Sequence, residues 1–172
     1  MKRTMVLAVL AAAIGFTATA DEWKIDGEFK KVSAAKFPSQ WIKNTPMFKN
    51  ATAVMVPGKE AKENAVKIES KSGTPTVFSA HLIPVKIGDK LEIEFEAKGK
   101  GKANVGVYLY GKSFVASASA TVAVDSPNKF TKYKTCVTLK KTPKPYTNAR
   151  AIFGLIGAGS VTFTDIEVET EK

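Results

Sequence analysis

The sequence is dominated by short runs in which apolar and polar residues alternate. Residues 91–98 read LEIEFEAK, and residues 105–110 read VGVYLY. This period of two is typical of β-strands that place one face on a core and the other toward solvent. We therefore expect the apolar positions of the two runs to be buried, namely Leu91, Ile93, Phe95, Val105, Val107 and Leu109.

The stretch between these two runs, GKGKAN at residues 99–104, contains no large apolar residue. Its glycines predict a turn centred on Gly101 that joins the runs into a hairpin. Antiparallel pairing would then set Glu94 opposite Tyr108 and Glu92 opposite Tyr110. The apolar faces of the two strands coincide in this register, which a shared core requires.

Further runs rich in β-forming residues occur along the rest of the chain. They cover residues 65–69, 77–85, 131–139, 149–156 and 161–168, with a turn at residues 157–160 joining the last two. Residues 42–64 are less regular, and no stretch has the composition of a linker between domains. This spacing of short strands predicts a single all-β sandwich.

The first twenty residues have the pattern of a signal peptide. Lys2 and Arg3 precede an apolar run at residues 5–16, and Ala18 and Ala20 provide small residues at the expected cleavage site. The alternative is a buried N-terminal helix. We expect cleavage near Ala20, which would leave residues 21–172 as one secreted or periplasmic domain. No later apolar run is long enough to span a bilayer.

Composition excludes several classes of site. With one His and one Cys, the chain has no intrachain disulfide, no thiolate-rich zinc site and no cluster of histidines. The formal net charge is +10, but 24 of the 26 basic residues are Lys, and the two arginines are Arg3 and Arg150. Lys is a hydrated point charge, whereas Arg is the usual reader of phosphates and guanine edges. We therefore predict no nucleic-acid partner.

Four segments resemble a known family. They are DGEFK at residues 26–30 followed by PSQW at 38–41, IPVKIGDKLEIEFEAK at 83–98, the strand at 130–139, and VTFTDIEV at 161–168. Together they are similar to carbohydrate-binding modules of families 4, 9 and 22, which have the galactose-binding-domain-like jelly roll. The resemblance implies a jelly-roll β-sandwich of two antiparallel sheets. It also implies a non-catalytic protein that binds a polysaccharide or oligosaccharide on one sheet face, and the N-terminal pattern implies that this protein is exported.

The resemblance raises the question of a structural Ca²⁺ ion. Family members often hold one near the positions that correspond here to Lys30 and Asp165. Ca²⁺ takes six to eight oxygen ligands, and Lys30 removes a carboxylate while adding a cation. Our hypothesis is that the Lys30 ammonium group lies near Asp165 and balances its charge in place of the ion. We predict no other cofactor or metal.

The row Glu92, Glu94 and Glu96 beside Tyr108 and Tyr110 is the candidate carbohydrate site. Aromatic faces stack on the C–H patches of sugars, and carboxylates and phenol groups bond their hydroxyls. The alternative is a solvated outer face, because alternation alone places polar residues there.

Several single residues are further candidates. His81 lies in a run that precedes the central family segment, so we include it among the candidate carbohydrate-binding residues; the alternative is a surface or core histidine.

Phe114, Tyr146 and Trp23 lie in or beside predicted loops and offer either rim contacts or loop packing. Trp41 matches a structural position of the family. For Cys136 we favour burial over an intermolecular disulfide.

Enzyme functions find little support in the sequence. Only His81 is available for a nucleophile–histidine arrangement, and no nucleophile-elbow motif occurs. Glutamates two apart on one strand lie side by side, whereas glycosidases need two carboxylates across a bond. We therefore predict a binding module. The alternatives are an envelope-associated structural or protein-interaction sandwich and, with less support, a small glycan hydrolase or lyase.

Overall fold

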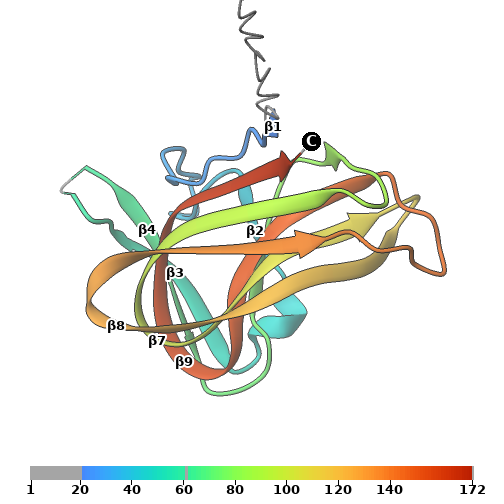
Figure 1. Ribbon diagram of the computed structural model, residues 1–172. Helices are drawn as coiled ribbons and strands as arrows, with labels where there is room; N and C mark the ends of the chain where they lie inside the picture. The colour runs from blue at the N-terminus through green and yellow to red at the C-terminus, as the bar shows by residue number, and fades with distance from the viewer. Residues whose placement is uncertain (1–20, 61, 172) are drawn as a thin grey trace, which may run out of the picture.

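The computed structural model describes residues 21–60 and 62–171, which form an all-β fold (Figure 1). Its elements, in chain order, are β1 (Asp21–Glu22), β2 (Trp41–Lys43), the 3₁₀ helix η1 (Thr45–Phe48), β3 (Ala51–Pro57), β4 (Asn64–Ser70), β5 (Thr76–Ser79), β6 (Ile83–Pro84), β7 (Lys90–Tyr110), β8 (Phe114–Thr138) and β9 (Asn148–Glu171). The predicted signal peptide and its cleavage site at Ala20 lie outside the described residues. No helix in the described part of the chain is long and apolar enough to cross a membrane.

Three long strands build both layers of the fold. β7, β8 and β9 have 21, 25 and 24 residues, and each curves from one layer into the other (Figure 1). In the first layer, residues 90–98 of β7 lie between residues 131–138 of β8 and residues 162–171 of β9. In the second layer, residues 99–110 of β7 lie between residues 114–126 of β8 and residues 148–161 of β9. We call these layers half A and half B.

The short strands extend the sheet from the other edge of β9. β5 pairs with residues 152–154 of β9 and β2 pairs with β5, which widens half B. β4 pairs with residues 159–163 of β9, around the bend, and β3 pairs with β4. β1 and β6 add short pairings near the two ends of β9. All these pairings are antiparallel, which confirms the predicted jelly-roll sandwich.

Aromatic side chains from both halves meet in the core between them. Phe163 in half A and Phe153 in half B have ring centroids 5.2 Å apart. Trp41 packs against Phe153 at 5.0 Å and donates its indole N–H to the carbonyl of Asp26 at 2.8 Å. The structural role predicted for Trp41 is confirmed. The six alternating apolar residues predicted to be buried are all 0–1% exposed.

The predicted hairpin at Gly101 is wrong. Residues 90–110 form one strand that bends without reversing, and Glu94 pairs with Lys134 and Glu167 rather than with Tyr108. At Gly99 the chain takes a φ of +134°, and a Cβ there would lie 2.1 Å from the carbonyl oxygen of Ser160. Glycine is needed here because two strands approach closely at a bend, which sequence alone does not distinguish from a turn.

The second predicted turn, at residues 157–160, is also wrong. β9 continues through this stretch, with Gly157 at a φ of +75° and a shift in its register with β7 nearby. The strand predicted at residues 65–69 is confirmed within one residue at each end. The run predicted at residues 131–139 forms only the last part of a longer strand, β8, which ends at Thr138. The first part of β8, residues 114–126, has no counterpart among the predicted strands. Its small residues give only a weak alternation in hydrophobicity.

Candidate functional site

The two candidate tyrosines lie on the outer surface of half B, opposite the core. Val107 and Leu109 of β7 are buried, so the alternating positions Tyr108 and Tyr110 point away from the core. Arg150 of β9 is directly opposite Tyr108 in register. We define the aromatic face as the cluster formed on this surface by Phe78, Tyr108, Tyr110, Phe114 and Arg150.

Arg150 is the centre of the aromatic face. Its guanidinium carbon lies 5.5 Å from the ring centroid of Phe78 and 5.5 Å from that of Tyr110. One terminal nitrogen donates to the carbonyl of Ser79 at 3.2 Å, while the buried Nε has no partner among the described residues. Two cation–ring contacts and a backbone hydrogen bond restrict the guanidinium, so its remaining N–H donors have defined directions.

Tyr108 is the buried member of the aromatic face. It is only 7% exposed, and its ring packs edge-on against Phe114 at 5.4 Å. Its hydroxyl accepts from the side-chain amide of Asn44 at 3.3 Å and lies 3.6 Å from the sulfur of Met47. Asn44 and Met47 belong to the segment around η1, so the loop after β2 covers this tyrosine. The geometry leaves Tyr108 little surface for a ligand.

Tyr110 and Phe114 are the more accessible aromatic residues. Phe114 begins β8 and is 53% exposed, and its ring meets that of Tyr110 edge-on at 6.0 Å. Burial raises the pKa of the Tyr110 hydroxyl, a shift that the neighbouring Arg150 partly offsets. Tyr110 is therefore neutral at pH 7 and able both to donate and to accept a hydrogen bond.

The glutamate row lies on the other half of the molecule. Glu92 and Glu94 point outward from half A and bind the ammonium groups of β8, where Lys134 contacts both and Lys132 contacts Glu94. These lysines hold the pKa of Glu94 below its usual value. Glu96 instead binds Lys59 at 3.2 Å. The structure therefore does not bring the row together with Tyr108 and Tyr110, because the expected hairpin is absent.

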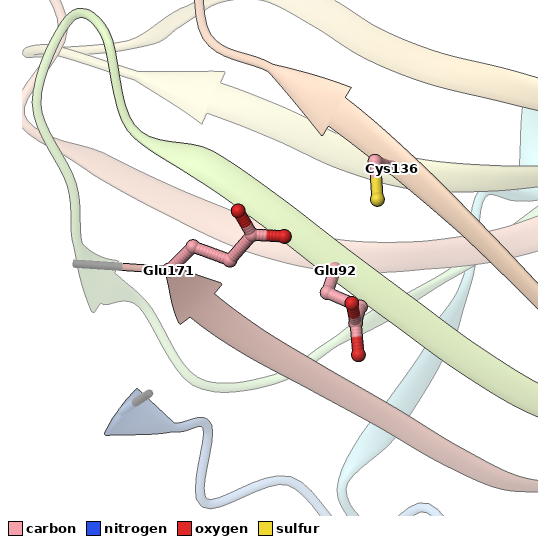
Figure 2. A group of neighbouring side chains, drawn as sticks. All are labelled: Glu92, Cys136 and Glu171. Atoms are coloured by element: carbon pink, nitrogen blue, oxygen red, sulfur yellow. The ribbon is translucent and has the colours of Figure 1, made fainter. Parts of the chain in front are cut away.

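Figure 2 shows a further group on the outer surface of half A, made by Glu92, Cys136 and Glu171 from three adjacent strands. One ligand atom from each lies within 4.8 Å of the others. Both carboxylates are already bound by ammonium groups, that of Glu171 by Lys90 at 2.7 and 3.0 Å and that of Glu92 by Lys134. We interpret this group as two neighbouring ion pairs beside a thiol.

The carboxylates near Asp165 do not fit a calcium ion. Both oxygens of Asp26 accept backbone N–H groups, at 3.0 and 2.8 Å. Lys59 binds one oxygen of Glu96. The second oxygen of Glu96 is buried and has no hydrogen-bond partner among the described residues, but it could supply only one ligand atom to a metal ion. Burial and the neighbouring carboxylates, Glu96 first, raise the pKa of Asp165. With an ammonium group among them, these oxygens do not supply the six or more ligands that Ca²⁺ needs.

The hypothesis about Lys30 needs a correction. Its ammonium group binds Glu28, and Asp165 makes only a minor electrostatic contribution to its raised pKa. Lys59 is the cation that contacts the carboxylates near Asp165, through its hydrogen bond to Glu96. The sequence did not indicate this role because the hairpin that carries Lys59 is far from Asp165 along the chain.

Other candidates separate into buried and exposed residues. Trp23 and Tyr146 are 4% and 5% exposed, so they pack in the fold rather than form a rim. The predicted burial of Cys136 is wrong, since its side chain is exposed on β8. His81 is exposed in the bend after β5, and no described residue forms a hydrogen bond or ion pair with its imidazole.

Sequence comparison identifies no relative: no protein-family model matches the chain, and no curated protein matches it. Solved structures do match in fold. A carbohydrate-binding module described as CBM4 has a TM-score of 0.53 and 15% identity over 85% of this chain and 98% of its own. The CBM22-1 xylan-binding domain of Paenibacillus barcinonensis Xyn10C has a TM-score of 0.51 and 8% identity over 85% of this chain and 92% of its own.

The fold also occurs as part of enzymes. The arabinose-bound MgGH51 α-L-arabinofuranosidase has a TM-score of 0.60 and 12% identity over 84% of this chain, which spans only about a quarter (26%) of that enzyme. At these identities the likeness concerns the fold alone. This chain has the jelly roll of carbohydrate-binding modules, as its sequence segments predicted.

Sequence reasoning missed Phe78 and Arg150 as members of the candidate site. Phe78 lies in the predicted strand at 77–85, and Arg150 was noted only as a rare arginine. A useful signal was available, because Arg150 is the only arginine after Arg3 and occurs within a strand-forming run. The members of the aromatic face, however, come from β5, β7, β8 and β9, and only the register of the folded sheet brings them together.

Proposed function

We propose that this protein is an exported, non-catalytic module that binds a polysaccharide or oligosaccharide on the aromatic face of half B. The observation that supports it most directly is the Arg150 guanidinium held between Phe78 and Tyr110, next to the exposed ring of Phe114. Export remains part of the proposal on the strength of the N-terminal pattern of residues 1–20.

The chemistry of this face suits a sugar. The rings of Tyr110 and Phe114 offer apolar surfaces for the C–H patches of a pyranose. The free N–H donors of Arg150 and the neutral hydroxyl of Tyr110 suit neighbouring hydroxyl groups. A neutral glycan fits these groups, and a carboxylate-bearing sugar would gain a charge-assisted bond to Arg150.

The fold and the outer surface of half A support this choice of face. The carbohydrate-binding modules that share the fold make glycan binding a reasonable expectation, although fold alone does not carry function. On half A, Lys132 and Lys134 occupy the carboxylates of Glu92 and Glu94 that a sugar would need. The proposed site is therefore the aromatic face and not the glutamate row, and Tyr108 packs against the residues that contact the ligand.

The test is affinity electrophoresis of the purified protein in gels that contain a series of soluble polysaccharides. We expect at least one polysaccharide to retard the protein, and Phe114→Ala and Tyr110→Ala to reduce its affinity by about tenfold each, the loss of roughly one stacking contact. Ile87→Ala is the matched control, because Ile87 is 54% exposed and Phe114 is 53% exposed.

Three outcomes would redirect or contradict the proposal. Retardation that is lost in Glu92→Gln but kept in Phe114→Ala would return the site to the glutamate row. The absence of retardation by every polysaccharide, for a protein that is folded by circular dichroism, would contradict glycan binding. Turnover of a glycan that is lost in His81→Ala would instead indicate an enzyme.

A further inference from the structure

The strand β8 leaves one of its edges open. Along its 25 residues it pairs with β7 alone among the described residues. Its other edge therefore presents backbone N–H and C=O groups outside the ladder, and such an edge is a template for another strand. A concavity of about 400 Å³ lies beside the middle of β8, lined by Ser117–Ser119 and Cys136–Thr138 and bordered by Lys140 and Thr142, so the described chain leaves open space at this part of the edge.

The other sheet edges are protected. β2 has three residues, and β3 has seven and ends at Pro57. The second part of β8 carries Lys132 and Lys134, and lysines on an edge oppose the approach of a second strand. Residues 114–124 of β8 differ from all of these, because they contain no charged residue and no proline. We call residues 114–124 the open segment.

We propose that the open segment pairs antiparallel with the open segment of a second copy, so that the half B sheets of two molecules become continuous. Antiparallel pairing of identical segments obeys a two-fold axis, so the same surface serves both copies. The axis would pass near Ser119, the middle of the segment. Each molecule would then add a strand to its partner.

Charge complementarity favours a second copy as the occupant. The first charges beyond the open segment are Lys112 before it and Asp125 after it, and both are exposed. Under the two-fold axis, Lys112 of one molecule approaches Asp125 of the other, and the pair occurs twice. Elsewhere the chain carries 23 further lysines, and like-charge repulsion opposes contacts between copies.

The side chains of the open segment also permit close approach. Ala116, Ala118 and Ala120 pack toward the core and are partly buried. Ser117, Ser119 and Thr121 alternate with them and are exposed. Small side chains on both faces leave the backbone edge accessible at residues 116–121, the middle of the segment.

The first test is the mass of the protein in solution, measured by sedimentation over a range of concentrations. We expect twice the monomer mass for the unaltered protein. Ser119→Lys places two like charges near the axis and should weaken the dimer by about tenfold or more. Thr52→Lys is the matched control, because Thr52 is exposed on the edge strand β3 and the change in charge is the same.

A crosslinking experiment tests the register independently of affinity. In a Cys136→Ser background, Ser119→Cys should form a covalent dimer on mild oxidation, whereas Thr52→Cys should not. A protein that stays monomeric up to its solubility limit overturns the proposal, and so does a dimer that Thr52→Lys weakens and Ser119→Lys leaves unchanged. Neither result bears on glycan binding, which the Tyr110→Ala variant tests separately because Tyr110 lies on β7, outside the open segment.

Discussion

The outer surfaces of the two halves differ, although the same three strands build them. On half A, glutamates of β7 alternate with lysines of β8 and form ion pairs, so the carboxylates and ammonium groups satisfy one another. On half B, the same two strands present Tyr110 and Phe114 beside Arg150. A surface whose polar groups are already paired offers little to a ligand, whereas rings with an adjacent guanidinium offer both stacking and free donors.

The largest effect is expected where the two halves join. Gly99→Ala should destabilise the protein by about 3–5 kcal/mol, because its Cβ would lie 2.1 Å from the carbonyl oxygen of Ser160. Urea unfolding measures the loss. Gly157→Ala is the control, since Gly157 also has a positive φ but nothing lies within 4 Å of a Cβ there. It should cost only about 1–2 kcal/mol, and equal losses at the two positions would contradict the importance of the close approach.

The next effect should separate the two surfaces by function. Arg150→Lys keeps the charge but loses the planar group between Phe78 and Tyr110, so glycan affinity should fall about tenfold. Stability should change by only about 1 kcal/mol. Affinity electrophoresis and urea unfolding of the same samples measure both quantities.

The control for Arg150→Lys comes from half A. The ammonium group of Lys98 lies 4.7 Å from the ring centroid of Phe130, which makes a second cation–ring contact away from the aromatic face. Lys98→Met should leave the affinity unchanged. If it lowers the affinity as much as Arg150→Lys does, the ligand binds through positive charge in general.

A smaller effect is expected in the ion pairs of half A. Lys134 has a raised pKa, first from its hydrogen bond to Glu92 and then from that to Glu94. Glu94 has a lowered pKa, first from its hydrogen bond to Lys132 and then from that to Lys134. The stability from Lys134 is present below its unfolded pKa of 10.5 and is lost as the pH rises through the folded value. The stability from Glu94 is present above 4.5 and is lost as the pH falls through its lowered folded value.

Lys134→Met should therefore lower the melting temperature by a few degrees at most at pH 7, because the pair is exposed and screened. The difference from the unaltered protein should shrink in strong acid, once Glu94 is protonated, and in high salt. Melting curves at pH 7 and pH 2.5, with and without salt, give the comparison. A difference that persists in acid would point to lost packing of the lysine stem.

The smallest effect concerns metal ions. Because ammonium groups already balance the carboxylates near Asp165, calcium and chelators should both leave the melting temperature unchanged. A marked rise with calcium that a chelator reverses would show that the ion displaces Lys59.

Sequence pattern predicted the fold better than the site. Alternation identified the buried positions of β7, because burial on one face is a local property of a strand. It could not tell a bend at Gly99 from a turn at Gly101, since both need glycine, and this one error placed Tyr108 opposite Glu94. The cluster around Arg150 depends on pairing between β5, β7, β8 and β9, which no local pattern encodes.

The continuity of β7, β8 and β9 has a consequence for how the protein folds. Because each of these strands belongs to both halves, neither half can detach without breaking ladders in the other, and unfolding should be a single cooperative transition. The pairing of β7 with β9 joins residues as far as 81 positions apart, such as Lys90 and Glu171. Chains with such distant contacts close large loops before they gain stability, so folding should be slow.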